Sequence, residues 1–212
     1  MITISAFKWV PPFAQGLVRD LRVRWALEEA GLPYRQRLID PEIQAGADYR
    51  ACQPFGQVPI FEDDALVLFE SGSIVLHIGE RSEALLPSDP AARARAITWV
   101  FAALNSIEVA ILPLVEIDLF HPDQEWAKLR RPDAEEMLRQ RLAELAAWLG
   151  EREYLEGRFT AGDLMMASVL RIPRHTDLVA EQPTLQAYLE RCVARPAFQR
   201  AYRDQMAVFE AA

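Results

Sequence analysis

The patterns of apolar residues divide this chain into two unlike parts. Short apolar segments bounded by turn residues, which are typical of β-strands, occur only before about residue 70, whereas the apolar segments after residue 90 repeat at helical spacing. Such segregation predicts an α/β domain followed by an all-helical domain. We place these domains at residues 1–84 and 91–212, and assign the proline-containing segment Leu85–Pro90 as the linker.

The first domain is predicted to fold in the order βαβ and then ββα. Val18, Leu21 and Trp25 follow the spacing of one helical face, which places Arg22 on another face. Gly31 is expected to end this helix. The predicted strands are residues 2–6, 34–39, 58–61 and 65–69, and the predicted helices are 16–30 and 71–80, the second opened by a serine able to cap it.

The second domain is predicted to consist of helices alone. Its first apolar-periodic stretch runs from residue 91 to about 119, and we expect Pro113 to interrupt it. The other predicted helices span residues 133–153, 161–171, 184–194 and 197–209.

Composition narrows the class of protein. The 212 residues are 51% apolar, which is enough for a sizeable core, and carry a net charge of −8. An acidic surface repels phosphate backbones, so we expect no nucleic-acid partner. No unbroken apolar run approaches the roughly 18 residues of a membrane span, so we expect no membrane association. Cys52 and Cys192 suit neither a disulfide framework nor a metal site, and the N-terminus lacks a secretory signal, so a cytoplasmic protein without a metal is expected.

Three local motifs carry functional information. The first is the loop Gln53–Ile60, which delivers Val58 and Pro59 to the start of a strand. A cis bond before Pro59 would present the Val58 main chain as an edge for an extended peptide ligand. The alternative is an ordinary turn.

The second motif is Glu70–Ser71, directly before a predicted helix. Unpaired N–H groups at a helix N-terminus attract anions, so Ser71 could hold a carboxylate while Glu70 holds an ammonium group. The pair would then bind the head of an amino acid. The alternative is a capped helix beside a solvated glutamate.

The third motif, Phe159–Leu164, is structural. Thr160 and Asp163 have the spacing of a capping box at the start of a helix.

In this order and spacing, the three motifs and the segment Val23–Tyr34 resemble the cytosolic glutathione transferase family along nearly all of the chain. The resemblance implies a thioredoxin-like N-terminal domain with a cis proline at Pro59, an all-α C-terminal domain and a homodimer. It also implies glutathione as co-substrate. Val58 would pair with the cysteinyl unit, Glu70 and Ser71 would hold the γ-glutamyl end, and Gln57 would lie near the glycyl end.

The sequence departs from the family where the glutathione sulfur should be activated. Members place a Tyr, Ser or Cys after the first strand, but residues 7–20 contain none, and Leu17 occupies the position expected for a serine. Lowering a thiol pKa from about 8.5 to about 6.5 takes roughly 2.7 kcal/mol, whereas a helix N-terminus gives about 0.3 to 1 kcal/mol. We therefore expect Gln15, Arg19 and the backbone of the turn at residues 13–19 to supply the remainder. Arg19 could equally be a solvated residue or pair with a partner subunit.

Two aromatic residues of the same region, Trp9 and Phe13, could wall a pocket for an apolar electrophile, or could be core or dimer contacts. The sequence thus predicts a glutathione transferase that conjugates glutathione to small hydrophobic electrophiles in a detoxifying role, with possible peroxidase activity. Its alternative is a non-catalytic dimeric protein that binds glutathione or another ligand.

Overall fold

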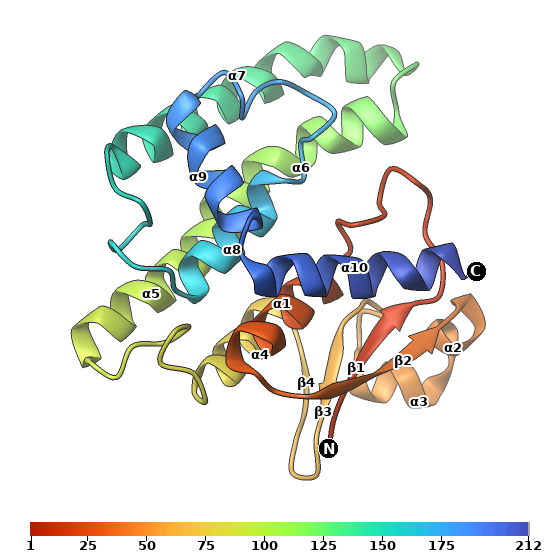
Figure 1. Ribbon diagram of the computed structural model, residues 1–212. Helices are drawn as coiled ribbons and strands as arrows, with labels where there is room; N and C mark the ends of the chain where they lie inside the picture. Colours follow the sequence, from red (N-terminus) through yellow and green to blue (C-terminus); the bar gives the residue numbers. More distant parts are fainter. Residues whose placement is uncertain (212) are drawn as a thin grey trace. The chain divides into compact units, whose positions relative to one another are not determined.

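The computed structural model describes residues 1–211, which form two compact units. One unit is Met1–Pro87 together with the residues from Ala194 onward, and the other is Ser88–Val193. Within the described residues every strand lies in the first unit (Figure 1). The final helix groups with this α/β unit, whereas the sequence analysis placed it in the helical domain.

The first unit is built on a mixed sheet in the order β2-β1-β3-β4. Strand β1 (Ile2–Phe7) is parallel to β2 (Tyr34–Ile39) and antiparallel to β3 (Ile60–Glu62), which is antiparallel to β4 (Val67–Phe69). The ends of β1, β2 and β4 and the start of β3 therefore lie at one end of the sheet. We call this end the site edge.

Helix α1 (Asp20–Ala30) begins four residues later than expected, after a run of turns. Its first eight residues are all buried, because α1 packs against α4 and α10 as well as β1. Arg22, which the spacing places on a different face from the apolar residues, is therefore buried as well, and so is Arg24. The reason is that α1 has covered surfaces on several sides.

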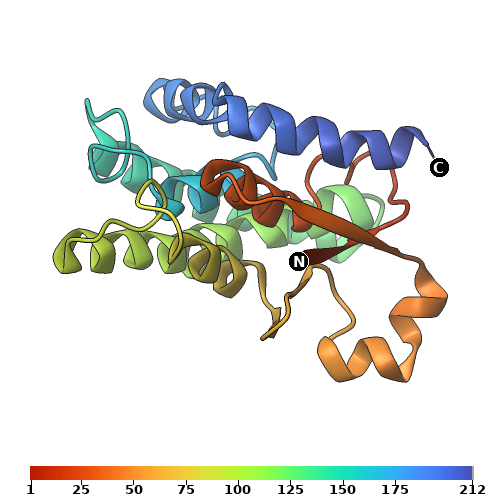
Figure 2. The same cartoon turned by 60° about the horizontal axis from the view of Figure 1, so that its bottom comes forward.

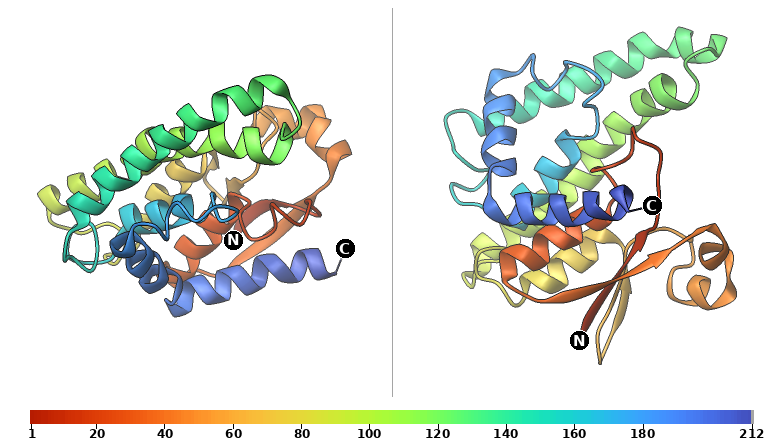
Figure 3. Two further views of the ribbon diagram at one scale, coloured as in Figure 1. Left: turned by 90° about the horizontal axis from the view of Figure 1, so that it is seen from above. Right: turned by 45° about the vertical axis from the view of Figure 1, so that its right-hand side comes forward.

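Two short helices, α2 (Pro41–Ala45) and α3 (Ala47–Cys52), occupy a segment for which the sequence analysis predicts no helix or strand (Figure 3). They are too short to establish an apolar repeat. A capping signal was nevertheless present, because the Asp40 carboxylate accepts a hydrogen bond from the Ile43 N–H at 3.0 Å and Pro41 is the first helical residue.

Helix α4 (Ser71–Gly79) follows β4, and α10 (Pro196–Glu210) runs alongside α1 (Figure 2). The Trp25 ring meets the Phe198 ring edge-on, with centroids 4.9 Å apart. Residues separated by most of the chain thus form one core in this unit.

The second unit contains a continuous helical stretch made of α5 (Pro90–Ala102), η1 (Ala103–Glu108), α6 (Val109–Val115) and η2 (Glu116–Phe120). The segments η1 and η2 are π-helical. Pro113 lies inside α6, so the expected interruption there is wrong. π-Helical segments lie on both sides of this proline. Proline has no N–H for the helical hydrogen-bond pattern, and irregular turns are common near such positions.

Helix α7 (Glu125–Leu149) begins eight residues before its expected start and contains Pro132. It packs against α6 and against α9 (Pro183–Val193), and α8 (Ala161–Leu170) is buried along its whole length. The capping box at the start of α8 is confirmed.

By length and composition alone, the stretch Pro90–Phe120 could cross a membrane. Scattered polar residues interrupt this stretch, so it contains no unbroken apolar run of about 18 residues. Core helices of globular proteins meet the same criterion, and 44% of its most apolar window is buried.

Candidate functional site

The predicted glutathione-binding residues follow one another along the site edge. Glu70 comes after β4, Pro59 comes before β3, and Lys8 and Asp40 follow β1 and β2. Neighbouring strands lie about 4.8 Å apart, so this row is about 14 Å long. The sheet topology therefore brings segments that are distant in sequence to one side of the unit.

The Val58–Pro59 peptide bond is cis, as predicted. The Val58 side chain is buried and packs with Ile39, Tyr49 and Ile60. Its main-chain N–H and C=O make no hydrogen bond within residues 1–211. A peptide group without internal partners beside a sheet can bind an extended ligand by main-chain hydrogen bonds.

Side chains from β1 and α3 hold this loop in place. The Tyr49 hydroxyl donates to the Gln57 carbonyl at 2.7 Å and lies 3.0 Å from the Ser5 hydroxyl, which accepts from the Ile60 N–H at 2.7 Å. Burial raises the pKa of Tyr49, so its hydroxyl stays protonated as a donor. The Gln57 side chain is exposed.

The α2–α3 pair supports the same loop, in which Gly56 has a positive φ of 64°. The Gln44 amide donates to the Gly56 carbonyl at 2.6 Å, and Arg50 donates to the Pro54 carbonyl at 3.2 Å. The positive φ favours glycine here, because a Cβ would be strained in that conformation, whereas the Arg50 guanidinium 2.4 Å from such a Cβ could move aside.

At the start of α4, Ser71 is the first helical residue rather than the cap, which corrects the expectation that it caps the helix. Within residues 1–211 no side chain caps this helix, so its first N–H groups can receive a ligand carboxylate. The buried Arg22 guanidinium donates to the Ser71 hydroxyl at 3.3 Å and adds positive charge there. Sequence periodicity missed Arg22, although an arginine next to the core residues Leu21 and Val23 was a signal.

Glu70 occupies the cap position with φ 71° and ψ 113°, the only non-glycine positive φ among the described residues. Such a conformation costs of order 1–3 kcal/mol and persists at ligand clamps when the surroundings enforce it. The Glu70 carboxylate is exposed, with no hydrogen bond or ion pair inside the described part of the chain.

The segment between β1 and α1 is anchored by contacts within the first unit. The Gln15 amide donates to the Val10 carbonyl at 3.2 Å, and Arg19 stands at the cap position of α1. Gly16 has φ 76°, and a Cβ there would lie 2.6 Å from the Tyr202 ring. The absent side chain of Gly16 thus makes room for Tyr202 of α10.

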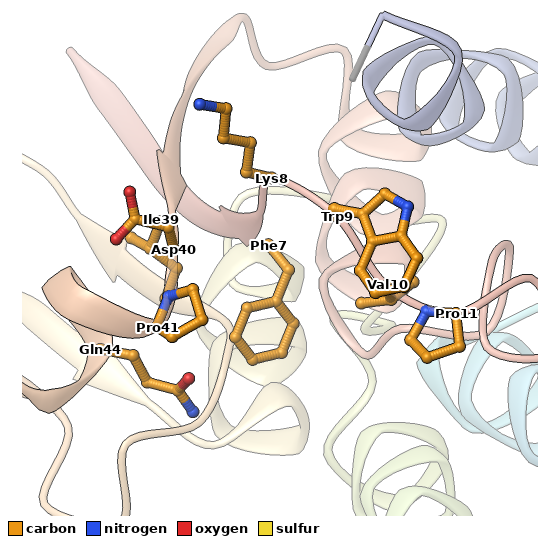
Figure 4. A pocket seen from close by; sticks show the side chains of 9 residues that line it. All are labelled: Phe7, Lys8, Trp9, Val10, Pro11, Ile39, Asp40, Pro41 and Gln44. Carbon is orange, nitrogen blue, oxygen red and sulfur yellow. The ribbon is translucent and has the colours of Figure 1, made fainter.

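A pocket of about 420 Å³ lies at the β1–β2 end of the site edge (Figure 4). Trp9 is one of its lining residues, whereas Phe13, the other aromatic residue considered as a pocket wall, is exposed and outside the lining. The lining consists of Phe7, Lys8, Trp9, Val10, Pro11, Ile39, Asp40, Pro41 and Gln44. Lys8 was not singled out from the sequence, although it directly follows a strand that ends at the site edge.

No group of three or more His, Cys, Asp or Glu side chains in residues 1–211 is arranged to hold a metal ion.

Comparison with protein families identifies both parts of the chain. Residues 15–80 match the model of the glutathione S-transferase N-terminal domain, and residues 104–196 match the model of the C-terminal domain.

Individual proteins are similar along most of their length. Glutathione S-transferase 3 of Zea mays is 33% identical over 199 residues, which cover 85% of this chain and 86% of that protein. A glutathione transferase from Burkholderia graminis, solved with two glutathione molecules per subunit, is 25% identical with a TM-score of 0.82, covering 95% of this chain and 87% of that one. A theta class glutathione S-transferase from Xanthomonas axonopodis pv. citri, solved with glutathione bound, is 29% identical with a TM-score of 0.78, covering 95% and 96%.

Proposed function

The chain belongs to the glutathione S-transferase family, and on that premise we propose that it joins the sulfur of glutathione to small hydrophobic electrophiles and reduces organic hydroperoxides with the same thiolate. Glutathione is its co-substrate. The observation that carries the proposal is the row at the site edge, where the unpaired main chain of Val58 lies between the N-terminus of α4 and an apolar pocket.

In this proposal glutathione lies along the site edge in an extended form. Its γ-glutamyl carboxylate binds the first N–H groups of α4 and the Ser71 hydroxyl, and its ammonium group pairs with Glu70. Its cysteinyl unit pairs with Val58 next to the cis Pro59, and Gln57 lies toward the glycyl end. The uncapped helix, the Arg22 guanidinium and the unpaired Glu70 carboxylate support this placement.

The turn at residues 13–19 stabilises the thiolate in place of a hydroxyl. Its candidates are Gln15, Arg19 and the N–H groups before α1. Together they must supply roughly 2.7 kcal/mol to lower the thiol pKa by about two units, which exceeds a helix dipole alone. The Gln15 amide donates to the Val10 carbonyl at 3.2 Å, which holds this side chain against the turn.

The chemistry then needs little from the protein beyond the thiolate and its orientation. The sulfur attacks the electrophilic carbon, the carbon–sulfur bond forms, and the leaving group departs with the bonding electrons. With a hydroperoxide, the thiolate attacks the terminal oxygen, the O–O bond breaks, and the alkoxide that leaves takes a proton from water to become an alcohol. The resulting sulfenic acid reacts with a second glutathione to give the disulfide and water.

Calorimetry with glutathione, followed by turnover of 1-chloro-2,4-dinitrobenzene and cumene hydroperoxide, tests the proposal. We expect Ser71→Ala to weaken binding by about tenfold, the loss of one hydrogen bond to a charged group. Ser73→Ala, on the exposed side of the same helical turn, should leave it unchanged. Absence of glutathione binding in the unaltered protein would refute the proposed site.

Thiolate activation is tested separately by titrating bound glutathione at 240 nm. A bound thiol that titrates no lower than the free tripeptide contradicts the role of the turn.

Leu17 in place of a hydroxyl favours one alternative, a non-catalytic glutathione-binding protein. Glutathione binding without turnover of either substrate selects that alternative.

We further propose a cytoplasmic homodimer. Large exposed apolar side chains on the second unit suit a subunit interface, among them Phe101, Phe120 and Leu129, the last 73% exposed. The two free thiols suit a reducing compartment. Analytical ultracentrifugation tests the dimer, and a mass of 24.1 kDa over a micromolar range would exclude it.

A further inference from the structure

The pocket at the site edge has two facing walls. Trp9, Val10 and Pro11 form an apolar wall, and the other consists of Ile39, Asp40, Pro41 and Gln44, with Phe7 between the two (Figure 4). A volume of about 420 Å³ is within the range of small-molecule sites. Aromatic and aliphatic walls of this kind suit a flat apolar body.

The polar side chains of the pocket differ in whether they already have a hydrogen-bond partner. Asp40 caps α2 through the Ile43 N–H at 3.0 Å, and the Gln44 amide donates to Gly56 at 2.6 Å. The Lys8 ammonium has no hydrogen bond or ion pair within residues 1–211 and is exposed. It is therefore the one charged group of this lining that has no partner in the described chain.

Lysine is also rare here. The chain has 23 Lys and Arg residues, of which only Lys8 and Lys128 are lysines. The Lys8 side chain extends away from Phe7, which places the ammonium at the rim of the pocket (Figure 4). In a protein of net charge −8, an unpaired ammonium at this rim is a local centre of positive charge that attracts an anion.

The strand order indicates which ligand groups could reach the Lys8 ammonium. Along the site edge Lys8 follows β1, the neighbour of β3, so it lies beyond Val58 as seen from Ser71. A tripeptide extends about 3.3–3.6 Å per residue, so one that starts at Ser71 and passes Val58 ends near β1. Its glycyl carboxylate, or an acidic group on a second substrate in the pocket, would meet the Lys8 ammonium.

We infer that Lys8 binds a carboxylate held in this pocket, either the glycyl carboxylate of glutathione or an acidic group of an aromatic electrophile. This inference rests on the proposed function. It makes Lys8 a specificity-determining residue for which Gln57 is no substitute, because an amide carries no charge.

Matched acids and esters test the inference with Lys8→Met, which keeps the apolar stem and removes the charge. Binding is measured for glutathione and its glycyl ethyl ester, and kcat/KM for 4-chloro-3,5-dinitrobenzoate and its methyl ester. We expect Lys8→Met to lower either the affinity for glutathione or the kcat/KM for 4-chloro-3,5-dinitrobenzoate by about tenfold. The same quantity should be unchanged for the corresponding ester. Lys8→Arg should restore most of the loss, and Lys128→Met should behave like the unaltered protein.

The pattern of losses identifies the source of the carboxylate. A loss with glutathione places the glycyl end at Lys8, and a loss with the dinitrobenzoate places the electrophile there. Equal effects on acids and esters, or no effect on either acid, overturn the inference while leaving the proposed function intact. If the unaltered protein neither binds glutathione nor turns over any substrate, both this inference and the proposed function are refuted.

A second measurement does not depend on turnover. Mild acetylation followed by peptide mass spectrometry reports the reactivity of each lysine, and Lys128 serves as the control within the same chain. The acid that depends on Lys8 should slow acetylation of Lys8 several-fold without affecting Lys128. Equal rates with and without that acid contradict a direct contact.

Discussion

At the scale of single residues, several side chains have contacts with distant parts of the chain that the surrounding sequence does not predict. Gly16 makes room for Tyr202, and the fully buried Arg24 pairs with Asp20 at 2.7 Å and with Asp204. A buried charge is tolerated only when it is paired, because desolvation is costly. These residues therefore depend on partners from distant parts of the chain.

Replacing Gly16 with alanine tests that dependence. We expect a loss of about 2–4 kcal/mol in the free energy of unfolding, since alanine meets both the positive φ and the Tyr202 ring. Gly31→Ala is the matched control, because Gly31 has φ 66° but nothing within 4 Å of a Cβ, and should cost only about 1 kcal/mol. In a Tyr202→Ala background, measured by urea unfolding, the cost of Gly16→Ala should fall to that of Gly31→Ala. An unchanged cost would remove the ring from the explanation.

Glu135 gives a prediction for pH dependence. Hydrogen bonds from Arg139, at 2.8 Å, and from Arg131 hold the pKa of Glu135 below its usual 4.5. Its stabilisation is therefore fully present above about pH 4.5 and is lost as pH falls through the lowered pKa.

Because this carboxylate is partly solvated, Glu135→Gln should cost under about 1 kcal/mol at pH 7 and nothing in strong acid. Urea unfolding at several pH values measures this, with the exposed neighbour Glu136 changed to Gln as the control. A cost that persists in strong acid would contradict the ion-pair origin.

At the scale of elements, α8 depends on one buried carboxylate. Asp163 accepts hydrogen bonds from the Leu155 and Thr160 N–H groups, both at 2.9 Å, and from the Tyr188 hydroxyl at 3.0 Å. It thus links the start of α8 to α9 and to the preceding loop. Burial raises the pKa of Asp163, which shows how strongly its environment excludes water.

Asp163→Ala should lower the free energy of unfolding by about 2–4 kcal/mol, because it removes a cap and leaves buried donors unpaired. Asp163→Asn keeps one acceptor oxygen and should cost less. Chemical denaturation followed by circular dichroism measures both, and equal costs for the two variants would show that the hydrogen bonds contribute little.

At the scale of the whole molecule, α10 completes the first unit. Its Gln205 amide donates to the Val18 carbonyl at 3.2 Å and to the Asp20 carboxylate at 2.8 Å, which fixes the turn before α1. Phe198 and Asp204 cover Trp25 and pair with Arg24. The α/β unit is therefore assembled from both ends of the chain.

A chain that stops at residue 193 should lose cooperative unfolding of the first unit, together with glutathione binding. The truncation removes Asp204, one of the two carboxylates paired with Arg24, and the Phe198 ring that packs on Trp25. Circular dichroism in urea and calorimetry with glutathione measure the two losses. A chain ending at residue 210 is the control, and equal midpoints for the two chains would show that α10 is dispensable.

The sequence by itself determined the class of fold and the motifs at residues 58–59, 70–71 and 160–163, because strand, turn and capping preferences are local. Only the tertiary structure decided that Arg22 lies buried beside Ser71, that α2 and α3 support the loop before Val58, and that Lys8 stands in the same row. These outcomes depend on strand order and on helices packed from distant segments. A local sequence pattern indicates whether a residue prefers to be buried or exposed. It does not indicate which distant residue will contact it in the folded chain.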